Sequence, residues 1–320
     1  MGTTPLDRLR AAASGTVTGP DDGGYDDARA PWNLTEQHPV AVLDASSPDD
    51  VEAAVAVAAD AGLRVVTQAT GHSSTGGFDD AVLIRTRELA SVDVDPARKV
   101  ATIGPGTHWG AVQEAAAEHG LTGLVGTAPH VSAVGFTMGG GVSWLGRTHG
   151  LASGRLRAAE LVLADGSRTR VDETSDPDLL WALRGGGGNF GIVVGMELDL
   201  VDAPELFAGV VMFPIERTRE LLGAWHEWTA SVSEAVTSML TVLRLPPAPF
   251  IPEEFRGKEL VVIGACHADG TDGAADLEPI RGLDPFMDTF GPMPPTGLGA
   301  LHNDPVDPLP DLGGAAMLKL

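Results

Sequence analysis

The chain has 320 residues, 43% of them hydrophobic, so it can bury a substantial core and is expected to form more than one domain. Asp and Glu number 44 against 21 Lys and Arg, which gives a formal net charge of −23. Nucleic acids and anionic membranes both need a cationic partner surface, so this negative charge disfavours both as partners. It is compatible with a soluble protein that acts on small molecules.

Cysteine usage and hydropathy limit the class further. Cys266 is the single cysteine, so the chain forms no intrachain disulfide and no thiolate metal site by itself. His108, His119 and His226 fall on expected helices without metal-ligand spacing, so no metal site is predicted. The N-terminal stretch lacks an apolar export-signal core, and no apolar run approaches about 18 residues, so a cytoplasmic protein without membrane spans is expected.

The first strong pattern follows an N-terminal region, residues 1–34, that is expected to be an irregular lead-in. Ser47 can cap a helix that has Pro48 at its first position and Asp50 at the capping-box position, and Gly62 can end it. Val51, Ala54, Val55 and Ala58 would form its buried face. Two strands are then expected, in "LRVVTQ" and "AVLIRT".

The next segments mix helices and antiparallel strands. Residues 99–123 predict a strand, a turn and a helix capped by Thr107 and ended by Gly120. Residues 156–173 predict a β-hairpin that turns at Asp165-Gly166. A short helix opened by Asp176-Pro177 and a long strand in "FGIVVGMELDLV" follow. This mixture indicates the α+β class rather than a doubly wound parallel sheet.

A change of character after Pro204 predicts a domain boundary near residue 203. Residues 204–281 read as strand, amphipathic helix and two further strands, which would make a partial antiparallel substrate domain. Residues 282–320 are rich in proline and glycine without periodicity, and they are expected to be poorly ordered.

Three glycine clusters lie within apolar, element-forming sequence, in residues 70–77, 135–147 and 183–194. A single cluster is most often a turn, but three in one domain indicate backbone that approaches a ligand closely, where a Cβ would obstruct. Successive backbone N–H groups in such loops suit a pyrophosphate. No cluster contains the Gly-Lys-Ser/Thr of a P-loop, and the first leads into a strand, unlike a Rossmann fingerprint.

The segments "TGHSSTGG", "GTAPHVSAVGFTMGGGVSWLGRTHGLASGRLRAAELVLADG" and "DPDLLWALRGGGGNFGIVV" resemble the signature segments of the FAD-binding PCMH-type oxidoreductases, in the branch of berberine bridge enzyme and glucooligosaccharide oxidase. The resemblance covers residues 35–203. It implies an FAD-binding domain of two α/β subdomains, followed by the substrate domain.

The resemblance also implies which residues meet the cofactor. His72 would bond covalently to the 8α carbon of the flavin, beside donors from Thr70, Gly71 and Ser73. Gly135, Gly139 and Gly140 would line the isoalloxazine and pyrophosphate, and the backbone of Val193 would meet the adenine end. Thr127, Val131 and Ser132 are the other residues that the resemblance implies for cofactor binding.

Several positions depart from, or refine, the family pattern. Ala128 stands where relatives carry a second, cysteinyl tether, so a single covalent bond is expected. Val131 matches a position where a small side chain leaves room for dioxygen, which favours an oxidase, although ordinary packing explains a valine almost as well. His149 replaces a tyrosine and Gly154 an aspartate. His130 would either face the substrate or have a structural role.

The implied activity is oxidation of a CH–OH or related C–H group of a sugar or secondary metabolite by hydride transfer to flavin N5, with dioxygen as the acceptor. The catalytic base cannot be assigned, because the single tyrosine, Tyr25, lies near the N-terminus and no C-terminal Asn-Tyr segment is present in these residues. The alternatives are a flavin-binding protein with impaired catalysis, a dehydrogenase that uses another acceptor, and a non-flavin scaffold in which the clusters are turns.

Overall fold

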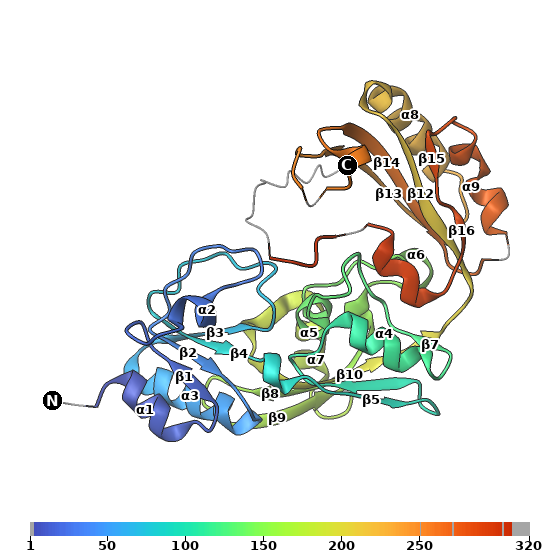
Figure 1. The fold of residues 1–320 in the computed structure, drawn as a ribbon. Coiled ribbons are helices and arrows are strands. Elements are labelled where there is room, and N and C mark those ends of the chain that lie inside the picture. The colour runs from blue at the N-terminus through green and yellow to red at the C-terminus, as the bar shows by residue number, and fades with distance from the viewer. Residues whose placement is uncertain (1–2, 250, 271, 303, 309–320) are drawn as a thin grey trace.

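The computed structural model describes residues 3–249, 251–270, 272–302 and 304–308 of the chain. A four-stranded and a five-stranded sheet lie side by side with their helices, and a third large sheet lies above them in the view of Figure 1. The combination of parallel and antiparallel strands with helices confirms the expected α+β class. Among the described residues, no helix has both the length and the apolar character needed to cross a bilayer.

The first sheet has the strand order β1-β2-β4-β3, in which β2 and β3 run parallel to β4 and β1 runs antiparallel to β2. Its elements are α1 (Pro5–Ala12), β1 (Thr16–Thr18), α2 (Tyr25–Arg29), β2 (Ala41–Asp44), α3 (Pro48–Ala61), β3 (Arg64–Gln68) and β4 (Ala81–Arg85). The two strands predicted on either side of the first glycine cluster are therefore present, and every residue of β4 is buried.

The expected irregular lead-in, residues 1–34, contains three regular elements, α1, β1 and α2. Thr4 and Asp7 form a reciprocal capping box at the start of α1, and Leu9 on this helix is fully buried. β1 extends the first sheet by pairing with β2. These elements have three to eight residues, too few for a hydrophobic period to be visible in the sequence.

Helix α3 forms as its sequence predicts. The Ser47 hydroxyl accepts from the Asp50 N–H, Pro48 occupies the first turn, and Gly62 ends the helix in the left-handed conformation with φ +68°. The expected apolar face is buried against the sheet, with Val51, Ala54 and Ala58 at 0% exposure.

The second sheet has the order β5-β6-β10-β8-β9, with every neighbouring pair antiparallel. Its strands are β5 (Val92–Asp95), β6 (Val100–Ile103), β8 (Leu156–Val162), β9 (Arg168–Asp172) and β10 (Ile192–Asp199), and a small ribbon pairs β7 (Leu121–Thr122) with β11 (Val201–Asp202). The accompanying helices are η1 (Arg87–Leu89), α4 (Trp109–Ala117), α5 (Ala133–Met138), α6 (Gly146–His149), η2 (Ala152–Arg155), α7 (Pro177–Gly186) and η3 (Gly187–Asn189).

Local signals in this region are mostly confirmed. β8 and β9 form the predicted hairpin, with Asp165 accepting from the Ser167 N–H in the turn. Asp176 caps α7 by accepting from the Leu179 N–H. Thr107, in contrast, does not cap α4, which begins after His108; its hydroxyl instead exchanges hydrogen bonds with the Ser91 backbone.

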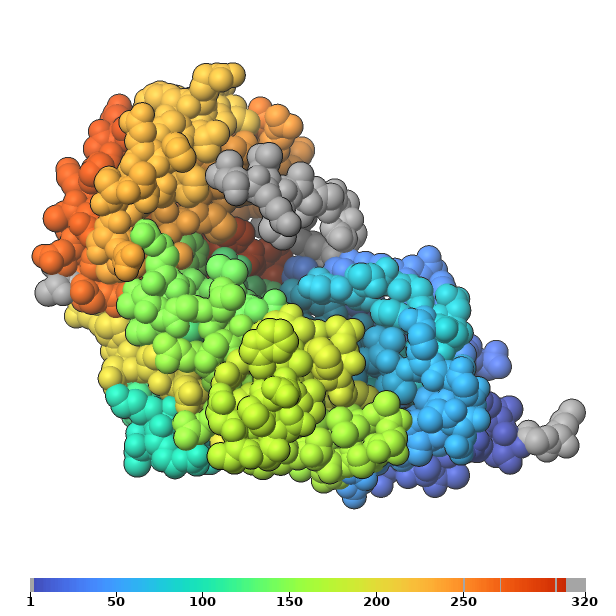
Figure 2. All heavy atoms as spheres, turned by 180° about the vertical axis from the view of Figure 1, so that it is seen from behind, coloured from blue at the N-terminus to red at the C-terminus, as the bar shows by residue number. Residues whose placement is uncertain are grey.

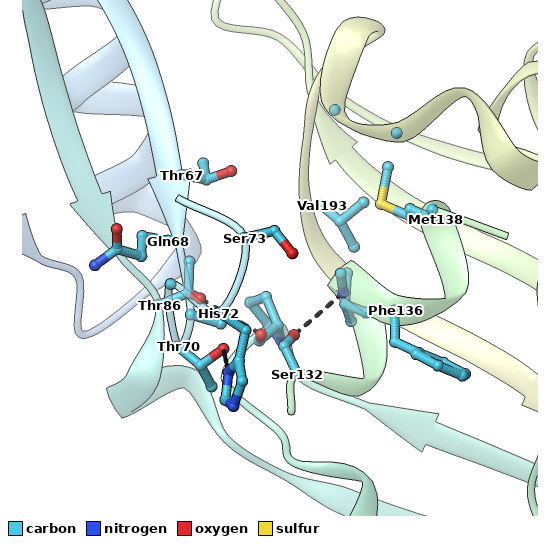
Figure 3. A pocket seen from close by; sticks show the side chains of 18 of the residues that line it. Thr67, Gln68, Thr70, His72, Ser73, Thr86, Ser132, Phe136, Met138 and Val193 are labelled. Atoms are coloured by element: carbon cyan, nitrogen blue, oxygen red, sulfur yellow. Dashed lines mark hydrogen bonds between the residues drawn. The ribbon is translucent and has the colours of Figure 1, made fainter. Parts of the chain in front are cut away.

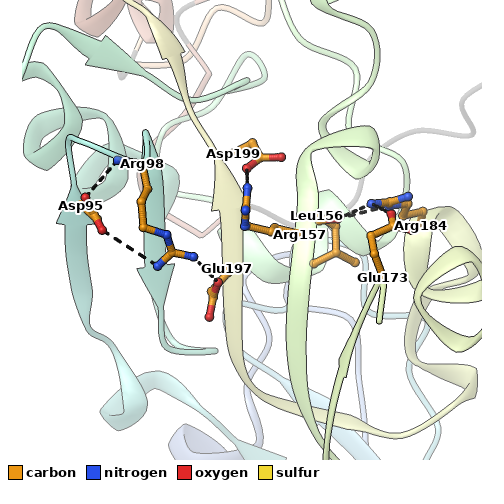
Figure 4. A network of polar contacts seen from close by, with 8 residues as sticks. All are labelled: Asp95, Arg98, Leu156, Arg157, Glu173, Arg184, Glu197 and Asp199. Atoms are coloured by element: carbon orange, nitrogen blue, oxygen red, sulfur yellow. Dashed lines mark hydrogen bonds and ion pairs between the residues drawn. The ribbon is translucent and has the colours of Figure 1, made fainter. Parts of the chain in front are cut away.

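Charged side chains tie the second sheet together on its open face (Figure 4). Arg157 on β8 contacts Asp199 on β10 at 2.9 Å, and Arg98 lies 3.7 Å from Glu197 on the same strand. Arg184, at the end of α7, donates to the Leu156 carbonyl and to Glu173. Because Arg184 directly precedes four consecutive glycines, these bonds fix the point from which the third glycine cluster starts.

The third sheet has the order β13-β14-β12-β15, and β16 also pairs with β12. Its elements are β12 (Leu206–Pro214), η4 (Ile215–Arg217), α8 (Thr218–Thr229), β13 (Val236–Arg244), η5 (Glu253–Phe255), β14 (Glu259–His267), α9 (Gly273–Arg281), β15 (Met287–Asp288), β16 (Gly291–Met293) and η6 (Pro295–Ala300). Helices α8 and α9 cover one face of the sheet, and Leu221, Trp228, Leu277 and Ile280 are buried between the layers. In Figure 2 the part of the chain that forms the third sheet and its helices, coloured gold to orange-red, lies above the part that forms the other two sheets.

Residues 282–320 were expected to be poorly ordered, and this expectation is wrong for the part of the range that forms regular elements. β15, β16 and η6 all lie within this range, and both strands pair with β12. Proline is tolerated here because β16 is a short strand at the sheet edge, where a missing N–H breaks few ladder bonds. Residues 309–320 of the same range lie outside the described residues.

We expect replacement of Asp50 by Asn to destabilise the fold. Asp50 is 2% exposed, and its carboxylate accepts from the backbone N–H groups of Ser14, Ser46 and Ser47. Burial raises the pKa of this carboxyl, but the hydrogen bonds outweigh burial and the net pKa is lowered. Its contribution is therefore present above the ordinary Asp pKa and is lost as the pH falls through the lower pKa of the folded state.

Chemical unfolding at neutral pH should show a loss of about 2 kcal/mol for Asp50→Asn, the scale of charge-assisted hydrogen bonds. The exposed Asp60, which pairs with Arg8, provides the control, and Asp60→Asn should change the free energy of unfolding much less. Equal losses in the two variants would contradict the role assigned to Asp50.

Candidate functional site

A cavity of about 480 Å³ opens where the end of β3 approaches α5, η3 and the start of β10 (Figure 3). Its walls combine apolar side chains, such as Val66 and Met138, with hydroxyl groups and exposed backbone. None of the described residues that line it is Lys, Arg, Asp or Glu. A cavity of this size and mixed polarity suits an extended cofactor that is held by neutral donors.

The first glycine cluster forms one wall as a loop, residues 69–78, between β3 and β4. Gly71 has φ +83°, and a Cβ there would lie 2.6 Å from the Cβ of Pro31, so another residue would be strained and would clash. Residues 31–33, here called the brace segment, run along the back of this loop. The Trp32 N–H donates to the Thr70 carbonyl at 2.9 Å, and the Asn33 side chain donates to the Ser74 carbonyl at 2.8 Å.

His72 lies in a stack of aromatic rings. The Trp32 ring lies parallel to the imidazole at a centroid distance of 4.2 Å and an interplanar angle of 11°. The His130 ring approaches to 4.9 Å and is tilted by 42°. The His72 Nδ1 is 2.8 Å from the Thr70 hydroxyl oxygen, a contact drawn in Figure 3. The His72 Nε2 is buried and has no hydrogen-bond partner among the described residues.

The second and third glycine clusters supply the facing walls. Ser132 caps α5 by accepting from the Gly135 N–H at 3.2 Å, and Gly139 is the C-cap of the same helix. A Cβ placed on Gly187 or Gly188 would meet no atom within 4 Å, so a side chain at either position would project into open space.

The structure brings most of the residues predicted from the sequence to this one cavity. Those that line it are Thr70, Gly71, His72, Ser73, Val131, Ser132, Gly135, Gly139 and Val193. Gly140 is not among the lining residues; it has φ +108° and its carbonyl accepts from the Ser153 N–H. Thr127 is not a lining residue either, and its hydroxyl donates to the Asp304 carboxylate at 2.8 Å.

Other residues of the site were missed in the sequence. Trp32 lies in the region expected to be irregular, yet it stacks on His72. Gly187, Gly188 and Gly191 also line the cavity. They belong to the third glycine cluster, and this cluster is the sequence feature from which they could have been predicted. The sequence left both a substrate-facing and a structural role open for His130. Both of its ring nitrogens are buried and have no partner among the described residues.

Several chemically capable groups lie away from this cavity. Tyr25 donates its hydroxyl to the Pro39 carbonyl in the first subdomain. Cys266 is fully buried on β14, where burial raises the pKa of its thiol to about 12, so the thiolate is not formed at neutral pH. The described residues contain no cluster of His, Cys, Asp and Glu that could hold a metal ion.

Two histidines near the site have pKa values shifted in opposite directions. Burial lowers the pKa of His72 to about 4, with smaller contributions in the same direction from His130 and His108. A hydrogen bond to Asp304, 2.6 Å between Nδ1 and Oδ1, raises the pKa of His302. His72 is therefore a neutral imidazole at physiological pH.

These directions predict that at about pH 6 the His72 ring is neutral and the His302 ring is mostly protonated. Long-range ¹H–¹⁵N NMR of the imidazole nitrogens over a pH titration measures both, with His72→Gln and His302→Gln variants for assignment. Protonation of His72 at or above the ordinary histidine pKa would contradict the burial assigned to it.

The residues present fit the FAD that the sequence resemblance implies. Gly187 and Gly188 line the cavity without side chains, the lining has no Lys, Arg, Asp or Glu, and His72 lines the cavity with one buried nitrogen that has no partner among the described residues. These are the features that close approach to a diphosphate and covalent contact with a flavin require.

Comparison with known proteins supports this fit. Residues 39–172 match the family model of the FAD binding domain. The chain is 31% identical over 292 residues to (R)-6-hydroxynicotine oxidase of Paenarthrobacter nicotinovorans, covering 88% of this chain and 60% of that protein. It is 37% identical over 192 residues to glucooligosaccharide oxidase of Sarocladium strictum, covering 58% of this chain and 38% of the other. The chain thus spans less than two thirds of the length of either relative.

Solved structures show the same fold. 6-Hydroxy-D-nicotine oxidase from Arthrobacter nicotinovorans matches with a TM-score of 0.79 at 26% identity, covering 91% of this chain and 64% of the other. A variant of the BBE-like 1 protein of Physcomitrella patens matches with a TM-score of 0.81 at 20% identity, covering 94% and 68%. The chain therefore has the PCMH-type flavoprotein fold, contains an FAD-binding domain, and is related to the FAD-linked oxidoreductases that include glucooligosaccharide oxidase.

Proposed function

We propose that this protein is an FAD-dependent oxidoreductase that oxidises a CH–OH or related C–H group of a sugar or secondary metabolite and passes the electrons to dioxygen. The observation that carries the proposal is the uncharged, glycine-lined cavity with His72 at its edge, in a chain whose residues 39–172 are an FAD-binding domain. The names of its relatives, hydroxynicotine oxidase and glucooligosaccharide oxidase, support the substrate class.

When bound, FAD supplies the hydride acceptor for this chemistry. The chain's own residues bind and orient it. Backbone of the first and third glycine clusters and the hydroxyl of Ser73, which points into the cavity in Figure 3, would hold the polar part of the cofactor. Val134, Met138 and Val193 are each at most 6% exposed, and this apolar wall would exclude water from the rings.

We further propose that His72 carries FAD covalently. The support is a neutral imidazole, whose pKa burial lowers to about 4, with one nitrogen unpartnered among the described residues. Only an unprotonated imidazole nitrogen has the lone pair that such a bond needs. Ala128 gives no thiol for a second bond, and Cys266 lies in the third sheet.

Dioxygen as acceptor and the cytoplasm as compartment complete the proposal. Val131 lines the cavity and is a small side chain, which supports access of dioxygen to the cofactor. The single cysteine, which leaves the chain without an intrachain disulfide, supports a reducing compartment.

The central test measures flavin content and its reduction. Protein produced with riboflavin available should be yellow, and anaerobic addition of a substrate from a panel of oligosaccharides, secondary alcohols and cyclic amines should bleach it. Re-aeration should restore the colour and release hydrogen peroxide. A flavin that stays bleached in air and is reoxidised only by an added electron acceptor would favour a dehydrogenase, and a flavin that no compound reduces would contradict the enzymatic proposal.

A cavity-filling variant locates the binding site in the same assay. Gly188→Leu should lose most of its flavin, because the new side chain would occupy open space beside the cavity. The control is Gly223→Leu on α8. A Cβ at Gly223 also meets nothing within 4 Å, but Gly223 is not one of the residues that line the cavity. Flavin content that is unchanged in Gly188→Leu would place the cofactor elsewhere.

His72→Ala tests the covalent bond separately. Flavin should remain with the acid-precipitated wild-type protein and be released from the variant, because alanine has no nucleophilic atom. Some FAD should still bind the variant noncovalently, since the rest of the cavity is intact. Intact-mass measurement checks the result, and a covalent adduct that persists in His72→Ala would move the attachment to another residue.

A further inference from the structure

A second cavity, of about 440 Å³, lies apart from the first and has no part in the proposed function. It opens where α4 and β7 meet the segment between β11 and β12 and the chain that runs through β16 into η6 (Figure 1). We call it the junction pocket, and residues from 113–122, 203–205 and 292–296 line it. None of these described residues lines the first cavity.

The inner part of the junction pocket is buried and has fixed walls. Leu121 is 4% exposed and lies on β7, which pairs with β11. Gln113 on α4 is also buried; its Oε1 accepts from the Thr122 hydroxyl at 3.0 Å, and its Nε2 donates to the Pro295 carbonyl at 3.4 Å. The Gln113 amide therefore ties α4 and β7 to η6 and holds the walls in a defined relative position.

The outer wall of the pocket accepts hydrogen bonds better than it donates them. Four of its described residues are prolines, namely Pro204, Pro292, Pro294 and Pro295. A prolyl residue has no backbone N–H, so these positions offer only carbonyl oxygens and apolar rings. Met293 adds an unbranched, polarisable side chain. A ligand that suits this wall has an apolar body and brings its own hydrogen-bond donors.

The charges around the pocket favour a cation. Glu205 is the one charged side chain among the described lining residues; it is exposed and forms no ion pair with any of them. The lining residue Ala117 ends α4, and the C-terminal end of a helix carries a partial negative charge. Lys99 is held by Asp202, 2.7 Å from its carboxylate, and the net charge of −23 further attracts cations.

We propose that the junction pocket binds a protonated amine that has an apolar body of about one ring. The ammonium group donates to the Glu205 carboxylate and to carbonyl oxygens of the proline wall, and the body packs on Leu121 and Met293. A sugar suits the pocket less well, because its hydroxyl groups would lose hydrogen bonds to water against these apolar side chains. The site goes beyond the proposed oxidoreductase activity and does not depend on it.

Benzylamine is the probe, because it carries an ammonium group on a single ring at neutral pH, and benzyl alcohol is the neutral compound of similar shape. Each is titrated into the full chain as produced, and backbone amide shifts are followed by ¹H–¹⁵N NMR. Benzylamine should shift the amides of Leu121, Thr122 and Thr296 until they saturate, whereas the amides of Thr70 and Ser132 report on the first cavity. Benzyl alcohol should bind about fivefold more weakly, the upper range for an exposed ion pair.

A charge variant tests the role of Glu205. Glu205→Gln should weaken benzylamine binding about fivefold and leave benzyl alcohol binding unchanged, because only the ammonium group interacts with the charge. Glu216→Gln, which alters an exposed glutamate of η4 outside the pocket lining, is the matched control and should bind both compounds as the wild type does.

Filling variants test the location. Ala117→Trp should abolish the saturable shifts by occupying the pocket, and Ala111→Trp, at an exposed position in the first turn of the same helix, should not. Thr296→Trp fills the pocket from the opposite wall and replaces Ala117→Trp if that variant does not fold.

Equal affinity for benzylamine and benzyl alcohol, or unchanged benzylamine affinity in Glu205→Gln, would overturn the recognition of an amine. Shifts confined to the amides of the first cavity, or saturable binding that survives the folded tryptophan variants, would overturn the assignment to the junction pocket. None of these results depends on flavin reduction, so the proposed function stands or falls separately.

Discussion

Close approach of the backbone to the cavity is the constraint on which the site depends. At Gly71 the backbone has φ +83° and lies against Pro31, and at Gly187 and Gly188 it faces open space. A Cβ at Gly71 would clash with Pro31, and a Cβ at Gly187 or Gly188 would meet no atom within 4 Å. All three glycine clusters, from separate places in the chain, contribute residues to the lining of one cavity.

This arrangement explains how a strongly acidic protein can hold an anionic cofactor. The net charge of −23 would repel a diphosphate, and the described lining residues include no Lys or Arg to offset the repulsion. Peptide N–H groups and the hydroxyls of Ser73 and Ser132 carry dipoles rather than net charge, and in a site from which water is excluded such dipoles interact strongly. Recognition by dipoles depends on geometry more than on charge, so the loops must be held in place from outside.

The contacts that hold these loops from outside the cavity were the least predictable from the sequence. The glycine clusters, the cap of α3, the 156–173 hairpin and the start of α7 could be predicted because each signal is local and lies within a few residues of its effect. Trp32 acts on His72 across forty residues, and Arg184 acts on Leu156 across nearly thirty, so neither contact leaves a pattern in the sequence. The same limit applies to β15 and β16, which become ordered only because β12 offers an edge for pairing.

The state of His72 follows from combining these near and distant contacts. A histidine in a polar loop would ordinarily titrate near neutrality, and the loop sequence alone gives no reason for another value. Burial in the fold, with smaller contributions from His130 and His108, lowers its pKa to about 4, so the ring stays neutral, and one nitrogen remains unpartnered among the described residues. A buried nitrogen without a hydrogen bond costs folding free energy, and a protein retains such a group where a ligand later satisfies it. Under the proposed covalent attachment, the flavin would be the group that satisfies this nitrogen.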